Sequence, residues 1–344
     1  MFKFDFDVED ESTDETKQGV TSDADRDPDE RPFQEYSLQD LIQTLPDDIS
    51  YSSVKVRDTH IPRRDLFDVR LQLMASEAQS DNLTDKAKED QAAIEFASRP
   101  SDLVPRVYEG GMKTWECSLD LAAYVLDEHV RGKKVLEDYN SSVLEYVTLP
   151  NMILVWFFSK AGESYRATIP PPSPKPDSKS KLPEVSNLTL ESVPEEDEEE
   201  AQVGPESPRA SYDPHAFDMT EPGDLAFPPA LRSAFQDSLS THHIELRFFS
   251  GPWDTFHPET PYDLVLTSET IYQPTSLPSL VRLLKDATCP SGKCLVAAKM
   301  VYFGVGGGIR EFEAALERGG SSVKCVWEQR EGVGRSIMQV VFGE

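Results

Sequence analysis

The feature that most constrains the fold of this chain is an alternation of strand and helix signals in its C-terminal part. Apolar runs predict strands at residues 243–249, 262–267 and 293–299. A helical pattern at residues 277–285 separates the last two of them. Parallel neighbouring strands need such a crossover, whereas antiparallel strands need only a short turn. The pattern therefore predicts an α/β domain built on a parallel sheet.

Two further strands follow and are expected to run against each other. A helix is predicted over residues 309–318, with Gly319-Gly320 as its stop signal. The apolar runs at 323–329 and 336–342 are joined through the short loop Glu331-Gly332-Val333-Gly334. We therefore expect a C-terminal antiparallel hairpin on an otherwise parallel sheet.

An earlier segment supplies one more strand and one more helix. Lys133–Glu137 has the pattern of a strand, and Asn140 or Ser142 is placed to cap a helix that continues to about Thr148. The unbroken apolar run Met152–Phe158 is either the buried continuation of this helix or another strand.

Composition divides the chain into packed and solvated parts. Residues 1–32 are acidic with few large apolar side chains, which predicts a disordered tail. Residues 33–100 are expected to form a partly helical N-terminal appendage, with Ser37 as its first helix cap. Residues 101–344 are expected to hold the main domain, interrupted at about residues 163–230 by a disordered, Pro-rich and acidic insertion.

The charge of the chain limits its partners. Its net charge is −28 at pH 7, and nucleic acids and anionic membranes repel such a chain, so we expect a basic protein partner instead. No apolar run reaches the roughly 18 residues of a membrane span, and the acidic N-terminus is unlike a signal peptide. The 4 cysteines lack the spacing of a zinc site. We therefore expect a metal-free monomer of the cytoplasm and nucleus.

Several sequence blocks resemble those of one enzyme family, in that family's order. They are similar to the protein-histidine methyltransferases of the methyltransferase-like 18 type, over most of residues 33–158 and 243–344. Several blocks in register are far more specific than a single glycine motif. The blocks are Arg63–Arg70, Gly110–Asp120, Asp138–Asn140 with Thr148–Asn151, Phe249–Trp253, Leu266–Tyr272 and Tyr302–Gly308.

The resemblance implies a fold and a reaction. The fold is a seven-stranded, Rossmann-like methyltransferase sheet, whose last strands reverse direction as the predicted hairpin does. The reaction takes a methyl group from S-adenosylmethionine to a histidine of a large-subunit ribosomal protein. The sulfonium already activates this methyl group, so the protein mainly aligns the two reactants and no metal is needed. The acidic charge of the chain suits a basic ribosomal substrate.

Glu137 and Asp138 are adjacent here, although the resemblance implies a whole crossover between them. In the family, the strand ending at Glu137 would continue into a glycine-rich cofactor loop, a helix and a second strand ending at the equivalent of Asp138. The resemblance therefore implies a sheet without its second strand and first crossover helix, a deficit of about 25 to 35 residues. Three explanations stay open: a wrongly drawn exon junction, a real short isoform, and a relative that has lost catalysis.

The resemblance also implies which residues hold the cofactor. Asp138 would accept hydrogen bonds from the ribose hydroxyls. Trp115 would cover the methionine end or, alternatively, be buried under the sheet. Gly251 and Trp253 would approach the adenine, and Ser268 would lie beside the methionine moiety. The other residues assigned to cofactor binding are Thr114, Glu116, Cys117, Tyr139 and Asn140.

Glu269 and Tyr272 are the candidate catalytic residues. Imidazole attacks a methyl group only when neutral, so an acceptor for its other ring N–H would select the reactive tautomer. Glu269 follows a strand at the C-terminal edge of the sheet, where doubly wound folds bind ligands. Tyr272 would line the substrate mouth. An acid at a strand end is also commonly a cap or one half of an ion pair.

Two functions follow from these observations. The first is an S-adenosylmethionine-dependent protein-histidine N-methyltransferase, whose activity in this form the missing crossover leaves open. The second is a noncatalytic, protein-binding member of the same fold, which keeps its substrate-facing loops but cannot hold the cofactor. Binding of S-adenosylmethionine distinguishes the two.

Overall fold

The computed structural model describes residues 33–77, 110–126, 134–169, 218–304 and 306–343. They belong to one compact unit, Pro32–Glu344. The expected acidic tail lies outside the described residues, as do the last part of the appendage and most of the expected insertion.

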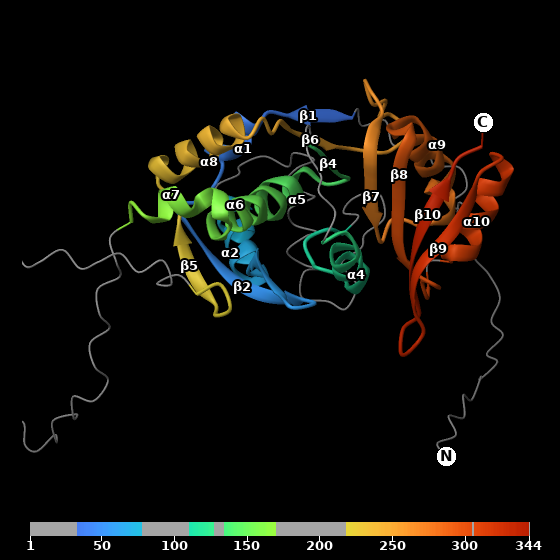
Figure 1. The fold of residues 1–344 in the computed structure, drawn as a ribbon, viewed down its shortest axis with the longest axis horizontal. Helices are drawn as coiled ribbons and strands as arrows, with labels where there is room; N and C mark the ends of the chain where they lie inside the picture. Colours follow the sequence, from blue (N-terminus) through green and yellow to red (C-terminus); the bar gives the residue numbers. More distant parts are fainter. Residues whose placement is uncertain (1–32, 78–109, 127–133, 170–217, 305, 344) are drawn as a thin grey trace, which may run out of the picture. The chain divides into compact units, whose positions relative to one another are not determined.

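A four-stranded sheet carries the C-terminal part of the chain (Figure 1). β7 and β8 run parallel, whereas β10 runs antiparallel to both β8 and β9. The expected C-terminal hairpin is therefore confirmed, with β10 lying between β8 and β9. The strands are β7 (Tyr262–Ser268), β8 (Thr288–Lys299), β9 (Ser322–Gln329) and β10 (Arg335–Val341), in the order β7-β8-β10-β9.

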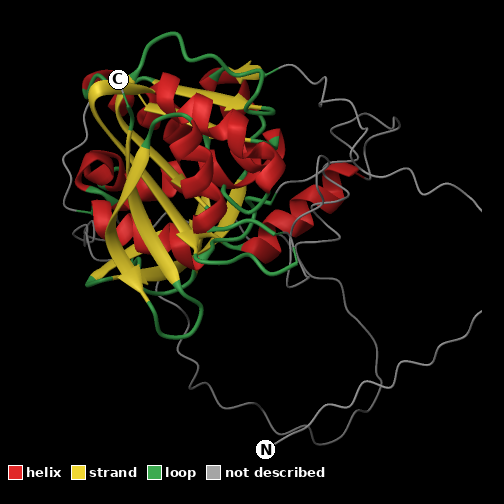
Figure 2. Cartoon of the chain, turned by 90° about the vertical axis from the view of Figure 1, so that its right-hand side faces the viewer, coloured by secondary structure: helices red, strands yellow, loops and turns green. Residues whose placement is uncertain are grey.

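Helices pack on both faces of this sheet because successive side chains of a strand point to opposite sides. Cys294, Val296 and Ala298 of β8 are buried in one cluster with residues of α9 (Leu277–Ala287) and α10 (Ile309–Arg318). Leu295 and Ala297 are buried in another cluster with Cys117 and Leu121 of α4 (Glu116–Val125). Figure 2 shows these strands with helices packed against them. The packing of α4 holds its first turn close to the sheet.

A second, three-stranded sheet contains the junction between Glu137 and Asp138. β6 is its middle strand, parallel to β4 and antiparallel to β1. The junction is no break in the structure, because β4 runs through it and ends at Asp138. The strands are β1 (Gln34–Tyr36), β4 (Lys134–Asp138) and β6 (Leu246–Ser250), in the order β1-β6-β4.

This arrangement differs from the expected single sheet of seven strands. Among the described residues, β4 and β6 lie in a different sheet from β7 and β8. The Rossmann type of doubly wound fold begins with the strand order 3-2-1-4-5. In this order β6 corresponds to strand 3, β4 beside it to strand 2, and β7 to strand 4. Strand 1, which would lie between β4 and β7, has no counterpart among the described residues. Two neighbouring parallel strands need a connecting segment, and none lies between Glu137 and Asp138. Both residues therefore belong to the same strand, β4.

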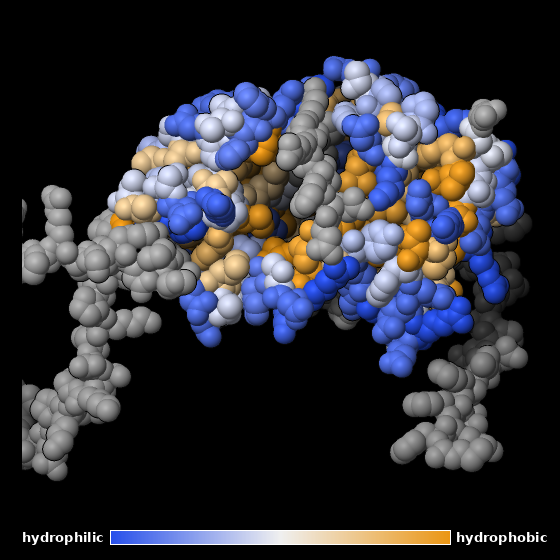
Figure 3. All heavy atoms as spheres, viewed as in Figure 1, coloured by the Kyte–Doolittle hydropathy of each residue, from blue (hydrophilic) through white to orange (hydrophobic). Residues whose placement is uncertain are grey.

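The missing neighbour leaves one edge of β7 without a described partner strand. Leu266 in the middle of β7 is 43% exposed, whereas its register partner Leu295 in β8 is fully buried. Figure 3 shows hydrophobic residues at the surface in the region of the four-stranded sheet. Leu266 is therefore much less covered than its register partner in β8.

The N-terminal region, expected to be a partly helical appendage, contains two helices and contributes two strands to a third sheet. Ser37 caps α1 as expected, since its hydroxyl accepts a hydrogen bond from the amide of Asp40 at 3.0 Å. The sheet is antiparallel, in the order β3-β2-β5. Its third strand comes from the range expected to be an insertion, so the described end of that range carries regular structure. The elements are α1 (Leu38–Gln43), β2 (Asp48–Val56), β3 (Thr59–Arg64), α2 (Leu66–Glu77) and β5 (Gly223–Ala226).

A helical run joins this region to the three-stranded sheet. Phe157 in this run is buried in one cluster with Ile49 of β2, Phe235 of α8 and Phe248 of β6. By length and composition alone Ser141–Phe158 could cross a membrane, but 61% of it is buried inside the protein, as in a core helix. The elements are α5 (Ser141–Val143), the π-helical η2 (Leu144–Thr148), α6 (Leu149–Phe158), η3 (Lys160–Gly162), α7 (Glu163–Arg166) and α8 (Pro229–Thr241).

Candidate functional site

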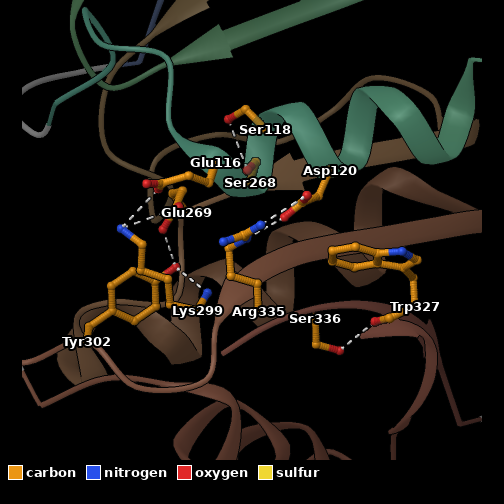
Figure 4. Close-up of polar contacts among 10 residues, drawn as sticks. All are labelled: Glu116, Ser118, Asp120, Ser268, Glu269, Lys299, Tyr302, Trp327, Arg335 and Ser336. Carbon is orange, nitrogen blue, oxygen red and sulfur yellow. Dashed lines mark hydrogen bonds and ion pairs between the residues drawn. The ribbon is translucent and has the colours of Figure 1, made fainter. Parts of the chain in front are cut away.

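The parallel strands β7 and β8 end side by side, and their ends carry the first group of candidate residues. Glu269 follows β7, and its amide donates to the carbonyl of Ala297 in β8 at 2.9 Å. Lys299 is the last residue of β8. The first turn of α4 reaches the same edge, because the Ser118 hydroxyl donates to the Ser268 hydroxyl at 3.1 Å (Figure 4). We call this group the sheet-edge cluster; it comprises Trp115, Glu116, Cys117, Ser268, Glu269, Tyr272, Lys299 and Tyr302.

The carboxylate of Glu269 lies at the centre of the sheet-edge cluster (Figure 4). Its Oε2 accepts a hydrogen bond from the Tyr302 hydroxyl at 2.6 Å. Its Oε1 lies 3.7 Å from the ammonium of Lys299, and that ammonium is 3.9 Å from Glu116 Oε2. Oε1 is buried and has no hydrogen-bond partner among the described residues. A buried acceptor without a donor is costly, so this oxygen is suited to a donor from a ligand.

The backbone of Glu269 is also unusual. Its φ is 60°, in the left-handed region that residues other than glycine rarely adopt. Such a conformation costs of order 1–3 kcal/mol and persists where surrounding structure holds it, often at functional sites. The turn after β7 is therefore held against its local preference, with the carboxylate of Glu269 placed beside Tyr302.

Aromatic rings enclose this carboxylate and its cation. The Lys299 ammonium lies 4.3 Å from the centroid of the Trp115 ring, within cation–π range. The Tyr272 ring meets the Tyr302 ring edge-on, with centroids 6.3 Å apart. A side chain at Gly307 would overlap the backbone of Tyr272, so only glycine fits at this position of the loop after β8. Trp115 is partly exposed rather than buried under the sheet.

Two buried groups beside Glu269 keep their protons. Burial, followed by the charge of Glu269, raises the pKa of the Tyr302 phenol. Burial, followed by the nearby Glu269, also raises the pKa of the Cys117 thiol. Tyr302 therefore remains a donor at neutral pH, and Cys117 remains an unreactive thiol.

The second group of candidate residues lies at the ends of β4 and β6. The amide of Gly251 donates to the carbonyl of Asp138 at 3.3 Å. Asp138 Oδ1 accepts the amide of Asn140 at 3.0 Å, and the Asn140 side chain donates to the carbonyl of Gly110 at 2.9 Å. A Cβ at Gly111, whose φ is 100°, would lie 2.8 Å from Asp138 Oδ2. We call this group the junction cluster; it comprises Glu137, Asp138, Tyr139, Asn140, Gly251 and Trp253.

Glu137 is the least satisfied acid of the junction cluster. Its carboxyl group is buried, and the indole of Trp253 donates to its Oε2 at 3.3 Å. Its Oε1 has no hydrogen-bond partner among the described residues. Burial, followed by the charge of Asp138, raises the pKa of Glu137 to about 8. The side chain is therefore largely neutral at pH 7.

The structure thus brings the sequence-predicted residues together in two clusters. Thr114 is exposed just before α4, and Tyr139 is partly buried in the turn after β4. Sequence reasoning missed Lys299, Tyr302 and Glu137 as site residues. The place of Lys299 at the end of a parallel strand is the signal that could have found it. In the described part of the chain, no group of three or more His, Cys, Asp or Glu side chains is placed to hold a metal ion.

A cavity of about 260 Å³ lies beside β6, away from the residues that the sequence assigned. Phe33 stacks on Phe256 in its wall, with ring centroids 4.0 Å apart. Arg247 is paired in this wall with Glu35 and Glu259 at 2.5 and 3.0 Å. Arg247, Glu35 and Glu259 already pair with one another, so the cavity offers a ligand fewer unpaired polar groups than either cluster does.

Comparisons with known proteins agree with the sequence blocks. Histidine protein methyltransferase 1 of Schizosaccharomyces pombe is 28% identical over 88% of this chain and 83% of that protein. Histidine protein methyltransferase 1 of Saccharomyces cerevisiae is 28% identical over 74% of this chain and 68% of that protein. The Histidine protein methyltransferase 1 homolog of Bos taurus is 29% identical over 71% of this chain, which spans 58% of that protein.

Other comparisons add less. No family model matches the chain. Among solved structures, the LepI complex with SAM is similar over 34% of this chain and 34% of that chain, at 13% identity and a TM-score of 0.25, which is too low to carry an argument. The resemblance predicted from the sequence blocks is confirmed by the curated proteins: this chain is a sequence relative of the histidine protein methyltransferases and, by that resemblance, an enzyme.

Proposed function

We propose that this chain is an S-adenosylmethionine-dependent protein-histidine N-methyltransferase that acts on a basic protein of the large ribosomal subunit. The observation that carries the proposal is the buried Glu269 carboxylate, whose Oε1 lacks a donor at the C-terminal edge of a parallel sheet. The names of the relatives support the reaction and the acceptor residue. The net charge of −28 supports a basic substrate. A protein that methylates ribosomal proteins would act in the cytoplasm and nucleus, and this is where we expect the chain.

The sheet-edge cluster has the groups that methylation of a histidine requires. When bound, S-adenosylmethionine would supply a sulfonium-bound methyl group for transfer to an imidazole nitrogen, with the electrons of the broken carbon–sulfur bond staying on sulfur. Glu269 Oε1 accepts the N–H of the other ring nitrogen, which leaves the attacking nitrogen with its lone pair. As the ring becomes positively charged, this carboxylate stabilises it and then takes the ring proton. Tyr272 lines the approach to the ring.

The junction cluster fits the nucleoside part of the cofactor. Asp138 offers acceptors to ribose hydroxyls, and the protonated carboxyl of Glu137, whose Oε2 accepts from Trp253, has its Oε1 left to pair with a hydroxyl. Trp253 lies beside them as an apolar wall. The family's first glycine-rich loop, whose backbone amides would approach the cofactor, is absent from this chain by the resemblance. We therefore expect the cofactor to be held more weakly than a complete site would hold it.

A second function is favoured by the central place beside β7, which no described strand fills. A fold that lacks this strand and its loop would keep a protein-binding surface without holding the cofactor. In that case the chain retains basic ribosomal proteins and transfers no methyl group. The sheet-edge cluster favours the enzyme, because simple protein binding does not need a buried carboxylate with one free acceptor.

Methylation of purified large-subunit ribosomal proteins tests the proposal. The chain is incubated at saturating tritiated S-adenosylmethionine, in parallel with a variant that carries a family crossover segment between Glu137 and Asp138. Acid hydrolysis and amino-acid analysis should find the label in methylhistidine, with a higher rate for the variant. Label in lysine, or no label from either protein, contradicts the proposal. Retention of ribosomal proteins without any label supports the noncatalytic function.

A further inference from the structure

Lys299 and Tyr302 surround the candidate catalytic carboxylate, yet neither has a role in the proposed reaction so far. Tyr302 binds one oxygen of Glu269 at 2.6 Å, and Lys299 lies 3.7 Å from the other. Both come from the end of β8 and the loop after it, whereas Glu269 follows β7 (Figure 4). The two neighbouring parallel strands thus meet at a single carboxylate.

We propose that Lys299 and Tyr302 are positioning residues that make Glu269 select a neutral imidazole and reject a cationic lysine side chain. The inference rests on the proposed function for the identity of the substrate group. The two residues have different roles. Tyr302 occupies one carboxylate oxygen of Glu269 and so determines which oxygen accepts from the substrate, and Lys299 places a positive charge beside that oxygen.

Tyr302 can donate its proton in one direction only. The backbone amide of Lys299 donates to the Tyr302 hydroxyl oxygen at 3.3 Å. The phenol has a single proton, which therefore goes to Glu269 Oε2. A hydrogen bond to a carboxylate is roughly twice as strong as one between neutral groups. Oε2 is thus occupied in the resting protein, and Oε1 is the oxygen left for the substrate.

Lys299 supplies charge without occupying Oε1. Its ammonium is 3.7 Å from this oxygen, which is beyond the usual range of a hydrogen bond. It lies over the Trp115 ring at 4.3 Å and within 3.9 Å of Glu116, which hold it from two further sides. The side chain is 18% exposed, so solvent screens this charge only in part. The free acceptor is therefore next to a fixed positive charge.

A fixed positive charge beside the acceptor discriminates between two methyl acceptors. A neutral imidazole donates an N–H to Oε1 and brings no charge of its own. A lysine ammonium would bring a second cation to within a few ångströms of Lys299, and this repulsion offsets its attraction to Glu269. Glu269 and Lys299 together therefore favour a group that donates an N–H and carries no charge, as a neutral histidine ring does.

Small probes test both parts of the inference on the full chain without cofactor. At pH 8.5 imidazole is neutral and has an N–H, 1-methylimidazole has none, and n-butylammonium is a cation. Binding is followed by the indole N–H signal of Trp115 in two-dimensional NMR, assigned with Trp115→Phe. We expect imidazole to bind about tenfold more tightly than 1-methylimidazole, which is the size of a charge-assisted hydrogen bond. Butylammonium should bind more weakly than imidazole.

Two substitutions separate the roles of the positioning residues. Tyr302→Phe should weaken imidazole binding about tenfold and leave 1-methylimidazole binding unchanged. Lys299→Met should strengthen butylammonium binding about tenfold, because the repelling charge is gone. Tyr124→Phe removes the hydroxyl of a partly buried tyrosine on α4 and should change neither. Circular dichroism and thermal melting confirm that each variant is folded.

The inference is overturned if imidazole and 1-methylimidazole bind equally, if imidazole does not bind, or if both substitutions leave the preferences unchanged. These outcomes do not depend on catalysis. Selective imidazole binding in a protein that never produces methylhistidine would contradict the proposed function alone. The two failures are therefore distinguishable.

Discussion

Glu269 and Glu137 both lie at the C-terminal end of a parallel strand, but the groups that surround their carboxyl groups differ. Each has a buried oxygen that lacks a donor among the described residues. Glu269 has the Tyr302 hydroxyl at 2.6 Å and the Lys299 ammonium at 3.7 Å. Glu137 has one indole donor at 3.3 Å and Asp138 as its neighbour in sequence, and its pKa is raised to about 8.

The difference follows from the neighbours of the two strands. β7 has β8 beside it, and the end of β8 supplies Lys299. β4 has β6 on one side, and no described strand on the other. An acid at the end of β4 thus lacks the donors that a central strand and its loop would bring. We therefore propose that the half of the site that binds histidine is formed and that the half that binds the cofactor is incomplete.

The largest expected effect is on catalysis at the sheet-edge cluster. Glu269→Gln keeps the size of the side chain but removes its charge and its ability to take the ring proton. The rate of histidine methylation should fall about 100-fold or more, the usual contribution of a positioned base. Tritium transfer at saturating cofactor measures it, with Glu317→Gln on the exposed face of α10 as control. A fall of less than threefold would remove Glu269 from the mechanism.

A smaller effect concerns the stability of the junction cluster. The folded-state pKa of Glu137 is about 8, above its ordinary value of 4.5, so the folded protein holds this proton after the unfolded chain has lost it. Stability from this group is therefore full below about pH 4.5 and falls as pH rises towards 8, by about 1.4 kcal/mol per pH unit. Urea unfolding from pH 5 to 8 measures it. Glu137→Gln should remove this slope; an unchanged slope contradicts the burial of the acid.

The smallest effect tests whether the edge of β7 is open. Leu266 is 43% exposed and its register partner Leu295 is fully buried, so the same substitution compares the two strands. Leu266→Ala should cost less than about 1 kcal/mol of unfolding free energy, against about 2 to 5 kcal/mol for Leu295→Ala. Equal costs in urea denaturation would mean that something covers the edge in solution.

The sequence predicted those elements whose signals are local. The helix cap at Ser37, the strand before Glu269 and the C-terminal hairpin follow from side-chain periodicity and stop signals. β3 was not predicted, because Pro62 and charged residues interrupt its pattern and its register comes from pairing with β2.

The candidate site divides in the same way. The position of Glu269 at a strand end, together with the resemblance, is enough to mark it. Its contact with Tyr302 joins residues 33 positions apart, which no local pattern encodes. Likewise, the sequence alone does not show that the place left empty by the described strands is the central rather than the second one; this appears only when β4 is paired with β6.

Calorimetry with S-adenosylmethionine tests the central claim most directly. The chain itself is compared with a variant that carries a family crossover segment between Glu137 and Asp138, under identical conditions. The incomplete cofactor half predicts that the variant binds at least about tenfold more tightly than the chain. Equal micromolar binding by both proteins would contradict the account, because the junction would then have no effect on the cofactor site.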